Sequence, residues 1–165
     1  MNEGNKFSLN IYNHYVVFRL DERQFALNLH SVERVVRAVA VTSLPKAPEL
    51  VLGVINIHGQ IIPVLDIRKL FHLPEKRINL NDQFILVKTR SRTIAILANE
   101  VSSVVERSEQ EVITEKDMLP DIEYIDGAIK LEDGTISMII MKDFDKFLAL
   151  ERAPTPDSAI QENLG

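Results

Sequence analysis

The stretch LGVINIHGQIIPVLDIRKLF, residues 52–71, decides the fold because it is largely aliphatic and yet is interrupted by two glycines and a proline. Its two halves read as strands joined by the turn His58-Gly59, in which glycine accepts a positive φ. Pro63 has no N–H, which predicts that the second strand lies at a sheet edge or carries a bulge there. The apolar hairpin is either the middle of a core or a surface built to meet another protein.

The segments around this hairpin are predicted to be short strands and turns. Residues 15–29 read as two strands around the turn DERQ, and the second strand alternates apolar and polar residues. Residues 30–39 carry valines at helical spacing, which predicts a helix, with a strand as the alternative because the segment is rich in β-branched residues. A loop with two prolines follows, and residues 66–74 are expected to contain a short helical turn.

The second half of the chain repeats the first. Residues 15–37 align without a gap on residues 84–106, a shift of 69 positions, the difference between 84 and 15. Two glycine pairs extend the match, Gly53 with Gly127 and, after one inserted residue, Gly59 with Gly134. The order of strands and turns agrees as well, which two unrelated alternating β segments would not explain. We expect these glycines to serve turns or, at Gly53, a close backbone approach between barrels.

A repeat unit of about 70 residues is too small for a wide sandwich but can close as a five-stranded barrel. We therefore expect a mainly β protein with two tandem five-stranded barrels related by a pseudo-two-fold, together with short helices. Packed barrels also explain the apolar hairpin, because its strands would face an interior on one side and a neighbour on the other. The expected organisation is an N-terminal extension (1–13), a folded part (14–150) with intertwined repeat segments at about 14–72 and 83–147, and a mobile polar tail (151–165).

The composition excludes several classes of function. A net charge of −5 argues against nucleic-acid binding, which needs a basic face. The chain has no cysteine, so disulfides and thiolate metal sites are impossible and a reducing cytosol is expected. The N-terminus does not read as a signal peptide, and the apolar runs are shorter than the ~18 residues of a membrane helix.

No motif for catalysis or for a cofactor is present. The four histidines are not at metal-ligand spacing, and the sequence contains no phosphate-binding loop, dinucleotide fingerprint or nucleophile elbow. The carboxylates of residues 109–117 read as a solvated turn rather than a catalytic pair. We therefore expect no catalytic residue, no cofactor and no metal.

The segment SVERVVRAVAVTSLPKAPELVLGVINIHGQIIPVLDIRKLF resembles the CheW family, the coupling proteins of bacterial chemotaxis. The family pattern is a V-x-x-V segment, a Pro-x-x-Pro loop, G-V-I-N-L-R-G and P-V-I-D-L-R. It is matched in order by Val32 and Val35, Pro45 and Pro48, residues 53–59 and residues 63–68. The resemblance covers about residues 13–150 and implies two five-stranded SH3-like barrels, in agreement with the repeat.

CheW-like proteins bridge a CheA-type histidine kinase to the cytoplasmic tips of methyl-accepting chemoreceptors. The resemblance thus implies a cytoplasmic, non-catalytic adaptor recruited to receptor arrays. Its partners would be the kinase regulatory domain and the receptor tip, with no nucleic acid and no insertion into the membrane. The tip is a helical hairpin, which in the family lies in the groove between the barrels. Carried over to this chain, the groove residues are Val32, Arg34, Val35, Asn56, His58 and Gly59.

Two positions depart from the family pattern. Arg34 stands where the family often has an acid, and His58 stands where it usually has the arginine of N-L-R-G. In the second repeat the frequent acid of V-D-x-V is also absent, since residues 98–101 read ANEV. These departures are explained either by drift at exposed positions or by a changed partner, such as a divergent receptor or a non-motility chemosensory pathway. A small-barrel enzyme is a remote alternative, and a CheV-like regulator would need a receiver, which we do not expect in the tail.

Overall fold

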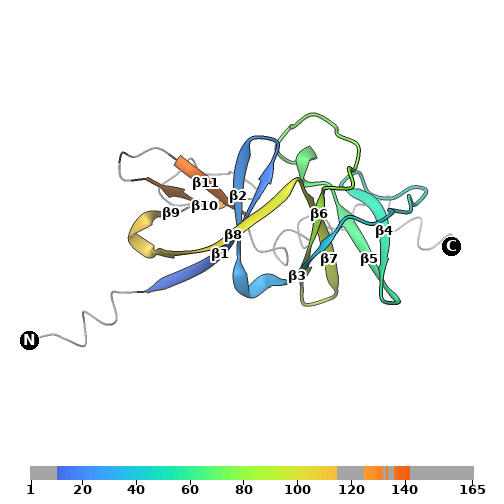
Figure 1. Ribbon diagram of the computed structural model, residues 1–165, viewed down its shortest axis with the longest axis horizontal. Helices are drawn as coiled ribbons and strands as arrows, with labels where there is room; N and C mark the ends of the chain where they lie inside the picture. The colour runs from blue at the N-terminus through green and yellow to red at the C-terminus, as the bar shows by residue number, and fades with distance from the viewer. Residues whose placement is uncertain (1–10, 115–124, 132, 134–135, 142–165) are drawn as a thin grey trace, which may run out of the picture.

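The computed structural model describes residues 11–114, 125–131, 133 and 136–141, which are built almost entirely from β-strands (Figure 1). The strands are β1 (Tyr12–Leu20), β2 (Arg23–Asn28), β3 (Val32–Arg37), β4 (Val51–Ile57), β5 (Gln60–Leu65), β6 (Gln83–Lys88), β7 (Thr93–Ala98), β8 (Glu100–Ser108), β9 (Val112–Thr114), β10 (Ile125–Lys130) and β11 (Ile136–Met141). The short helices among these residues are single 3-10 turns, η1 (Leu29–Ser31), η2 (Ile67–Lys69) and η3 (Glu109–Glu111). The mainly β fold class is confirmed, and so is the helical turn expected before Pro74.

The helix expected at residues 30–39 is wrong. Residues 30–31 are the last two residues of η1, and residues 32–37 form β3. A bulge between Val32 and Arg34 interrupts the pairing of β3 with β6. The extra residue places Val32 and Val35 against one buried cluster and Val36 against another. A β-bulge therefore produced the spacing of three that resembles a helical stripe.

The strands form two sheets that lie side by side in Figure 1. Sheet A has the order β8-β1-β2-β11-β10-β9, and sheet B has the order β3-β6-β7-β5-β4. Each sheet takes strands from both repeats, since β1 and β2 join β8–β11 while β6 and β7 join β3–β5. Replacing each strand by its equivalent in the other repeat (β3 by β8, β6 by β1, β7 by β2, β5 by β11, β4 by β10) converts sheet B into sheet A. The strand order thus obeys the expected pseudo-two-fold, with strands exchanged between the repeats.

Each sheet is closed by the chain that continues from its first strand. After β3, Thr42 bridges to Val54 on β4 through two backbone hydrogen bonds of 2.9 Å. After β8 and η3, the chain forms β9, which pairs with β10. Sheet A has six strands rather than five because this closing segment is a full strand there, while in sheet B it is a single bridge.

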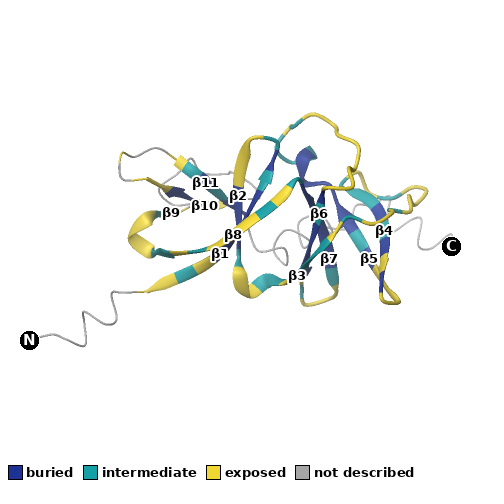
Figure 2. Cartoon of the chain, viewed as in Figure 1, coloured by how far each residue is buried: buried dark blue, intermediate teal, exposed yellow. Residues whose placement is uncertain are grey.

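The described residues form three buried apolar clusters, and Figure 2 shows how burial concentrates on the central strands of the two sheets. One cluster lies within sheet A and one within sheet B. The third and largest cluster joins the two sheets: Phe18, Leu20, Phe25, Leu27, Leu65, Ile67, Ile85, Val87, Ile94, Ile96, Ala98 and Met141. Neighbouring residues of one strand belong to different clusters: Phe84 is in the cluster within sheet B, and Ile85 is in the cluster between the sheets. The two-sided burial expected for residues 52–71 is confirmed on β5, where Val64 and Leu65 divide in the same way.

The central hairpin forms as expected around His58-Gly59, with φ values of 51° and 87° and Ile57 paired with Gln60. The edge position expected for Pro63 is wrong, because β5 lies between β7 and β4. Pro63 faces Val54, whose own N–H and C=O bond to Thr42, so β4 needs no N–H from Pro63. The bulge is on the partner strand, where the register shifts between Val51 and Gly53.

The approach between barrels expected at Gly53 is wrong, because Gly53 allows a close backbone approach within sheet B. A Cβ there would lie 2.8 Å from the carbonyl carbon of Thr42, at the closure of sheet B. Gly127 has the equivalent position in sheet A, since a Cβ there would overlap the carbonyl oxygen of Ile113 on β9. Gly134 lies outside the described residues.

Candidate functional site

The six residues predicted to line a receptor groove lie on β3 and on the β4–β5 hairpin, and the strand directions bring both to one end of sheet B. β3 is antiparallel to β6, so it begins where β6 ends. β7 is antiparallel to β6 and parallel to β5, so the β6–β7 turn lies at the same end as the β4–β5 turn (Figure 1). We call this the turn end of sheet B and define it by residues 32–34, 58–59 and 88–93.

Four of the predicted residues, Val32, Arg34, His58 and Gly59, belong to the turn end, whereas Val35 and Asn56 lie further along β3 and β4. The predicted residues also differ in exposure. Arg34, His58 and Gly59 are exposed, whereas Val32 and Val35 are half-buried against the cluster between the sheets. Among the described residues no hydrogen bond or ion pair joins Arg34 to His58. The structure thus puts the two at the same end of one sheet, and their sharing of a groove stays a prediction.

Among the predicted receptor residues, Asn56 stabilises the β4–β5 turn. Its Oδ1 accepts a hydrogen bond of 2.8 Å from the N–H of Gly59, which ties the strand to its own turn. This bond helps to hold His58 in a left-handed conformation that is uncommon for a residue with a Cβ. The asparagine and glycine of the N-x-x-G motif are therefore explained by the hairpin, and of the two residues between them Ile57 is buried and His58 is exposed.

The sequence prediction missed the β6–β7 turn, which lies at the same end. Thr89 fixes this turn: its N–H donates to the carbonyl of Arg92 at 2.9 Å, and its hydroxyl accepts from the Arg92 N–H at 3.1 Å. Lys88, Arg90 and Arg92 are exposed on it. Comparison of the two repeats could have found this feature, because RSRT in the second repeat aligns with DERQ in the first.

A second group of polar residues lies at the seam between the two sheets, centred on Arg68. The Arg68 side chain is 6% exposed, and its Nη2 lies 2.6 Å from Oδ2 of Asp21 in the β1–β2 turn. Its Nη1 donates to Oδ1 of Asn99, between β7 and β8, at 3.3 Å, and its Nε donates to the Pro74 carbonyl at 3.0 Å. Asp66 accepts from the Arg68 N–H at 3.1 Å and so caps η2. Arg68 follows a strand of sheet B and holds a turn of sheet A, so the D-I-R motif joins the sheets.

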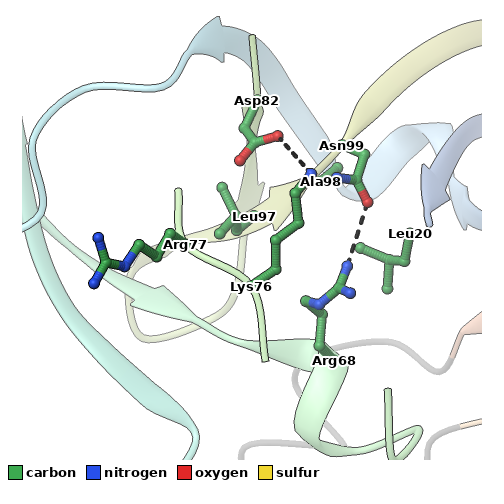
Figure 3. Close-up of a pocket in the computed structure, with 8 residues that line it drawn as sticks. All are labelled: Leu20, Arg68, Lys76, Arg77, Asp82, Leu97, Ala98 and Asn99. Carbon is green, nitrogen blue, oxygen red and sulfur yellow. Dashed lines mark hydrogen bonds and ion pairs between the residues drawn. The ribbon is translucent and has the colours of Figure 1, made fainter. Parts of the chain in front are cut away.

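Figure 3 shows the small pocket beside this seam. It is lined by Leu20, Arg68, Lys76, Arg77, Asp82, Leu97, Ala98 and Asn99. Asp82 is buried, and its carboxylate accepts from the Asn79 N–H at 2.7 Å and lies 3.7 Å from the Lys76 ammonium. The carboxylate and the guanidinium in this pocket are thus committed to bonds that order the chain after β5, which is a structural arrangement and not an acid–base pair aimed into a cleft.

Two searches of the described residues bear on other classes of function. No three His, Asp or Glu side chains among them are grouped to hold a metal ion. None of the helices formed by these residues is long and apolar enough to cross a membrane.

Comparison with known proteins agrees with the fold and the repeat. Residues 14–152 match the family model of the CheW-like domain. The chemotaxis protein CheW of Treponema pallidum is 26% identical over 132 residues, which cover 76% of each chain. The CheW of Bacillus subtilis is 26% identical over 129 residues, 75% of this chain and 81% of that protein.

The solved structures give the same result. The crystal structure of the scaffolding protein TtCheW from Thermoanaerobacter tengcongensis matches with a TM-score of 0.70 and 28% sequence identity, covering 81% of this chain and 90% of that one. Sequence and structure therefore agree over most of the chain: this protein belongs to the CheW family of β-rich chemotaxis scaffold proteins.

Proposed function

We propose that this protein is a non-catalytic adaptor that couples a CheA-type histidine kinase to the cytoplasmic tips of methyl-accepting chemoreceptors, or to a related receptor array. The observation that carries the proposal is that Arg68 and Asp82, the most buried charged side chains among the described residues, are used to hold the sheets together and to order the chain. What the fold offers to other molecules is exposed surface at strand ends. The adaptor domain would comprise residues 14–150, with residues 1–13 and 151–165 as extensions.

The turn end of sheet B is the proposed receptor surface. A helical hairpin meets a groove with aliphatic side chains at regular spacing and with a few polar groups that set its register. The half-buried Val32 and Val35 would supply apolar contact, while Arg34 and His58 would set the register. Asn56 and Gly59 would act by keeping the β4–β5 turn rigid.

The outer face of the β4–β5 hairpin is the proposed kinase surface. Ile61 is 60% exposed on β5, and it points away from the sheet B cluster that contains its neighbour Ile62. Val39 and Leu44, in the segment after β3, are also exposed. Apolar side chains of this size on a surface are suited to contact with another protein, and the kinase carries a related domain.

The proposal is tested by reconstituting the complex from purified parts. Titration with the regulatory domain of the cognate kinase, and separately with a soluble receptor signalling hairpin, should show saturable binding to each, and a mixture of all three should give a ternary complex. An Ile61→Lys variant should lose kinase binding and keep hairpin binding. Absence of binding to either partner at high micromolar concentrations would refute the adaptor function.

A second candidate is a divergent regulator of a non-motility chemosensory pathway. The observation that favours it is the pair of departures, Arg34 and His58, both of which are exposed at the turn end. Binding to receptors of a non-motility pathway, with no binding to receptors that control motility, would support this candidate.

A further inference from the structure

The two repeats carry opposite charges in equivalent turns. With the shift of 69 residues, Arg90 and Ser91 of the β6–β7 turn occupy the places of Asp21 and Glu22 in the β1–β2 turn. The repeats therefore provide an internal comparison, because the same fold element is acidic in sheet A and basic in sheet B. Since both turns close the same kind of hairpin, the basic charges are not required by the fold.

In sheet A two charged residues at the β1–β2 hairpin, Arg19 and Asp21, have partners of opposite charge. Asp21 accepts from the buried Arg68, and Arg19 lies 3.2 Å from the carboxylate of Glu100. In sheet B the equivalent of Arg19 is Lys88, and the equivalent of Glu100 is Ser31, which has no charge. Within the part of the chain that the structure describes, neither Lys88 nor Arg92 has a carboxylate partner.

These cations lie near the predicted receptor residue Arg34. Arg34 is opposite Leu86 on β6, and Lys88 follows two residues later on the same side of that strand. Diagonal neighbours of this kind are about 7–8 Å apart between their backbones. Glu33 also lies here and accepts from the Thr93 hydroxyl at 3.1 Å.

The charge of the turn end is opposite to that of the rest of the chain. The residues that define it carry four cations (Arg34, Lys88, Arg90 and Arg92) and one anion (Glu33), a net charge of 4 − 1 = +3. The whole chain has a charge of −5, so all other residues together carry −5 − 3 = −8. Among the residues that the structure describes, those outside the turn end carry 10 cations and 12 anions, a net charge of −2, so the basic charge is concentrated at the turn end.

We propose that the β6–β7 turn is a further docking surface, which together with Arg34 binds an acidic segment of the receptor hairpin. This inference rests on the proposed adaptor function and adds the chemistry of the partner. A nucleic acid or an anionic bilayer extends beyond the turn end, where the other described residues carry 10 cations and 12 anions and so provide no excess of cations to neutralise phosphates. A few carboxylates on one face of a helix present a compact charge of matching size. Because Thr89 already fixes the turn, little conformational entropy is lost on docking.

The test uses a matched pair of charge reversals. Arg92→Glu and Arg23→Glu alter equivalent exposed positions in the turns of sheet B and sheet A, and both lower the net charge by two. Association with a soluble receptor signalling hairpin would be followed by stopped-flow. We expect Arg92→Glu to slow association by roughly fivefold or more at low salt. Arg23→Glu should leave the rate within about twofold of wild type, since it acts only through net charge. The difference should vanish near 1 M salt, where the Debye length is about 3 Å.

The possible outcomes separate this inference from the function on which it rests. Equal effects of the two variants would overturn the docking surface, while hairpin binding by wild type would still support the adaptor function. Loss of binding to phosphatidylserine vesicles with unchanged hairpin binding would assign the surface to lipid and overturn the proposal. A change confined to self-association in ultracentrifugation would assign it to a second copy, with the same consequence. If the wild-type protein does not bind the hairpin, the adaptor function and this inference both fail.

Discussion

Gly53→Ala should damage the fold more than any change at the exposed hairpin turn, because its Cβ would enter the closure of sheet B. The added carbon would lie 2.8 Å from the Thr42 carbonyl carbon and 2.9 Å from Cγ1 of Val41, and closer still to the Thr42 carbonyl oxygen. Thr42 is also the residue whose two 2.9 Å hydrogen bonds with Val54 close the sheet. The substitution must therefore move residues 41–42 away from β4.

The size of the effect follows from what this movement breaks. Two backbone hydrogen bonds contribute about 0.5–1.5 kcal/mol each to the free energy of unfolding. The φ of +154° at Gly53 adds about 1 kcal/mol of strain for a residue with a side chain. We expect a loss of about 3 kcal/mol in total. At Gly59 no atom lies within 4 Å of an added Cβ, so only the φ of +87° matters and Gly59→Ala should cost about 1 kcal/mol.

Thermal and urea unfolding followed by circular dichroism would measure both losses. For a chain of this size, each 1 kcal/mol lowers Tm by about 2–4 °C. Gly59→Asn is the control, because asparagine tolerates the left-handed region and should remain close to wild type. Gly127→Ala should behave like Gly53→Ala, since its Cβ would overlap the Ile113 carbonyl. Equal stability of Gly53→Ala and Gly59→Ala would show that Thr42 does not close the sheet, and a wild-type Tm for Gly59→Ala would refute the hairpin turn.

Three further predictions concern binding and pH. The double reversal Arg34→Glu with His58→Arg should weaken binding to the cognate receptor hairpin, with Arg34→Glu alone costing about 1–3 kcal/mol; unchanged affinities at about pH 6 and about pH 8 would mean that both positions are surface drift. Titration with the kinase regulatory domain should reveal a transient interface that buries less than ~2,000 Å² and depends on few side chains, so that alanine changes spread evenly over the surface would contradict it. Burial raises the pKa of Tyr15 above its ordinary 10.0, so the neutral phenol stabilises the fold below about pH 10 and this contribution is lost as the pH rises further. Tyr15→Phe should therefore unfold less readily in alkali than wild type, and an identical alkaline transition would refute the role of Tyr15.

The fold could be predicted from the sequence because both repeats use the same local signals. The pairs Gly53 with Gly127 and Val32 with Val101 align, and equivalent residues then lie on equivalent strands. The prediction failed where one inserted residue changed the periodicity. The bulge at the start of β3 gave three valines a spacing that suits a helix, and only the pairing of β3 with β6 shows that they belong to a strand.

The candidate site was harder to predict because its parts come together only through tertiary structure. Arg34 and His58 are separated in the sequence, and the parallel pairing of β5 with β7 is what brings their strand ends to one side of sheet B. The basic turn was missed for a different reason. An alignment of the repeats draws attention to identical residues, such as Arg23 and Arg92. The basic turn was indicated by a mismatched pair instead, Asp21 and Arg90.

The strand exchange explains why two equal repeats can have unequal surfaces. Each sheet takes two strands from the other repeat, and the largest buried cluster lies between the sheets, so both repeats are needed to complete either sheet. Buried residues of β6 and β7 alternate between the cluster within sheet B and the cluster between the sheets, so mutations there would disturb both sheets. This constraint keeps the buried residues of the two repeats similar. The turns are under no such constraint, since Asp21, which bonds to Arg68, is replaced by an arginine, Arg90, at the equivalent position. A duplicated scaffold built in this way keeps its symmetry in the core and can diverge in charge at its ends, where partners would bind.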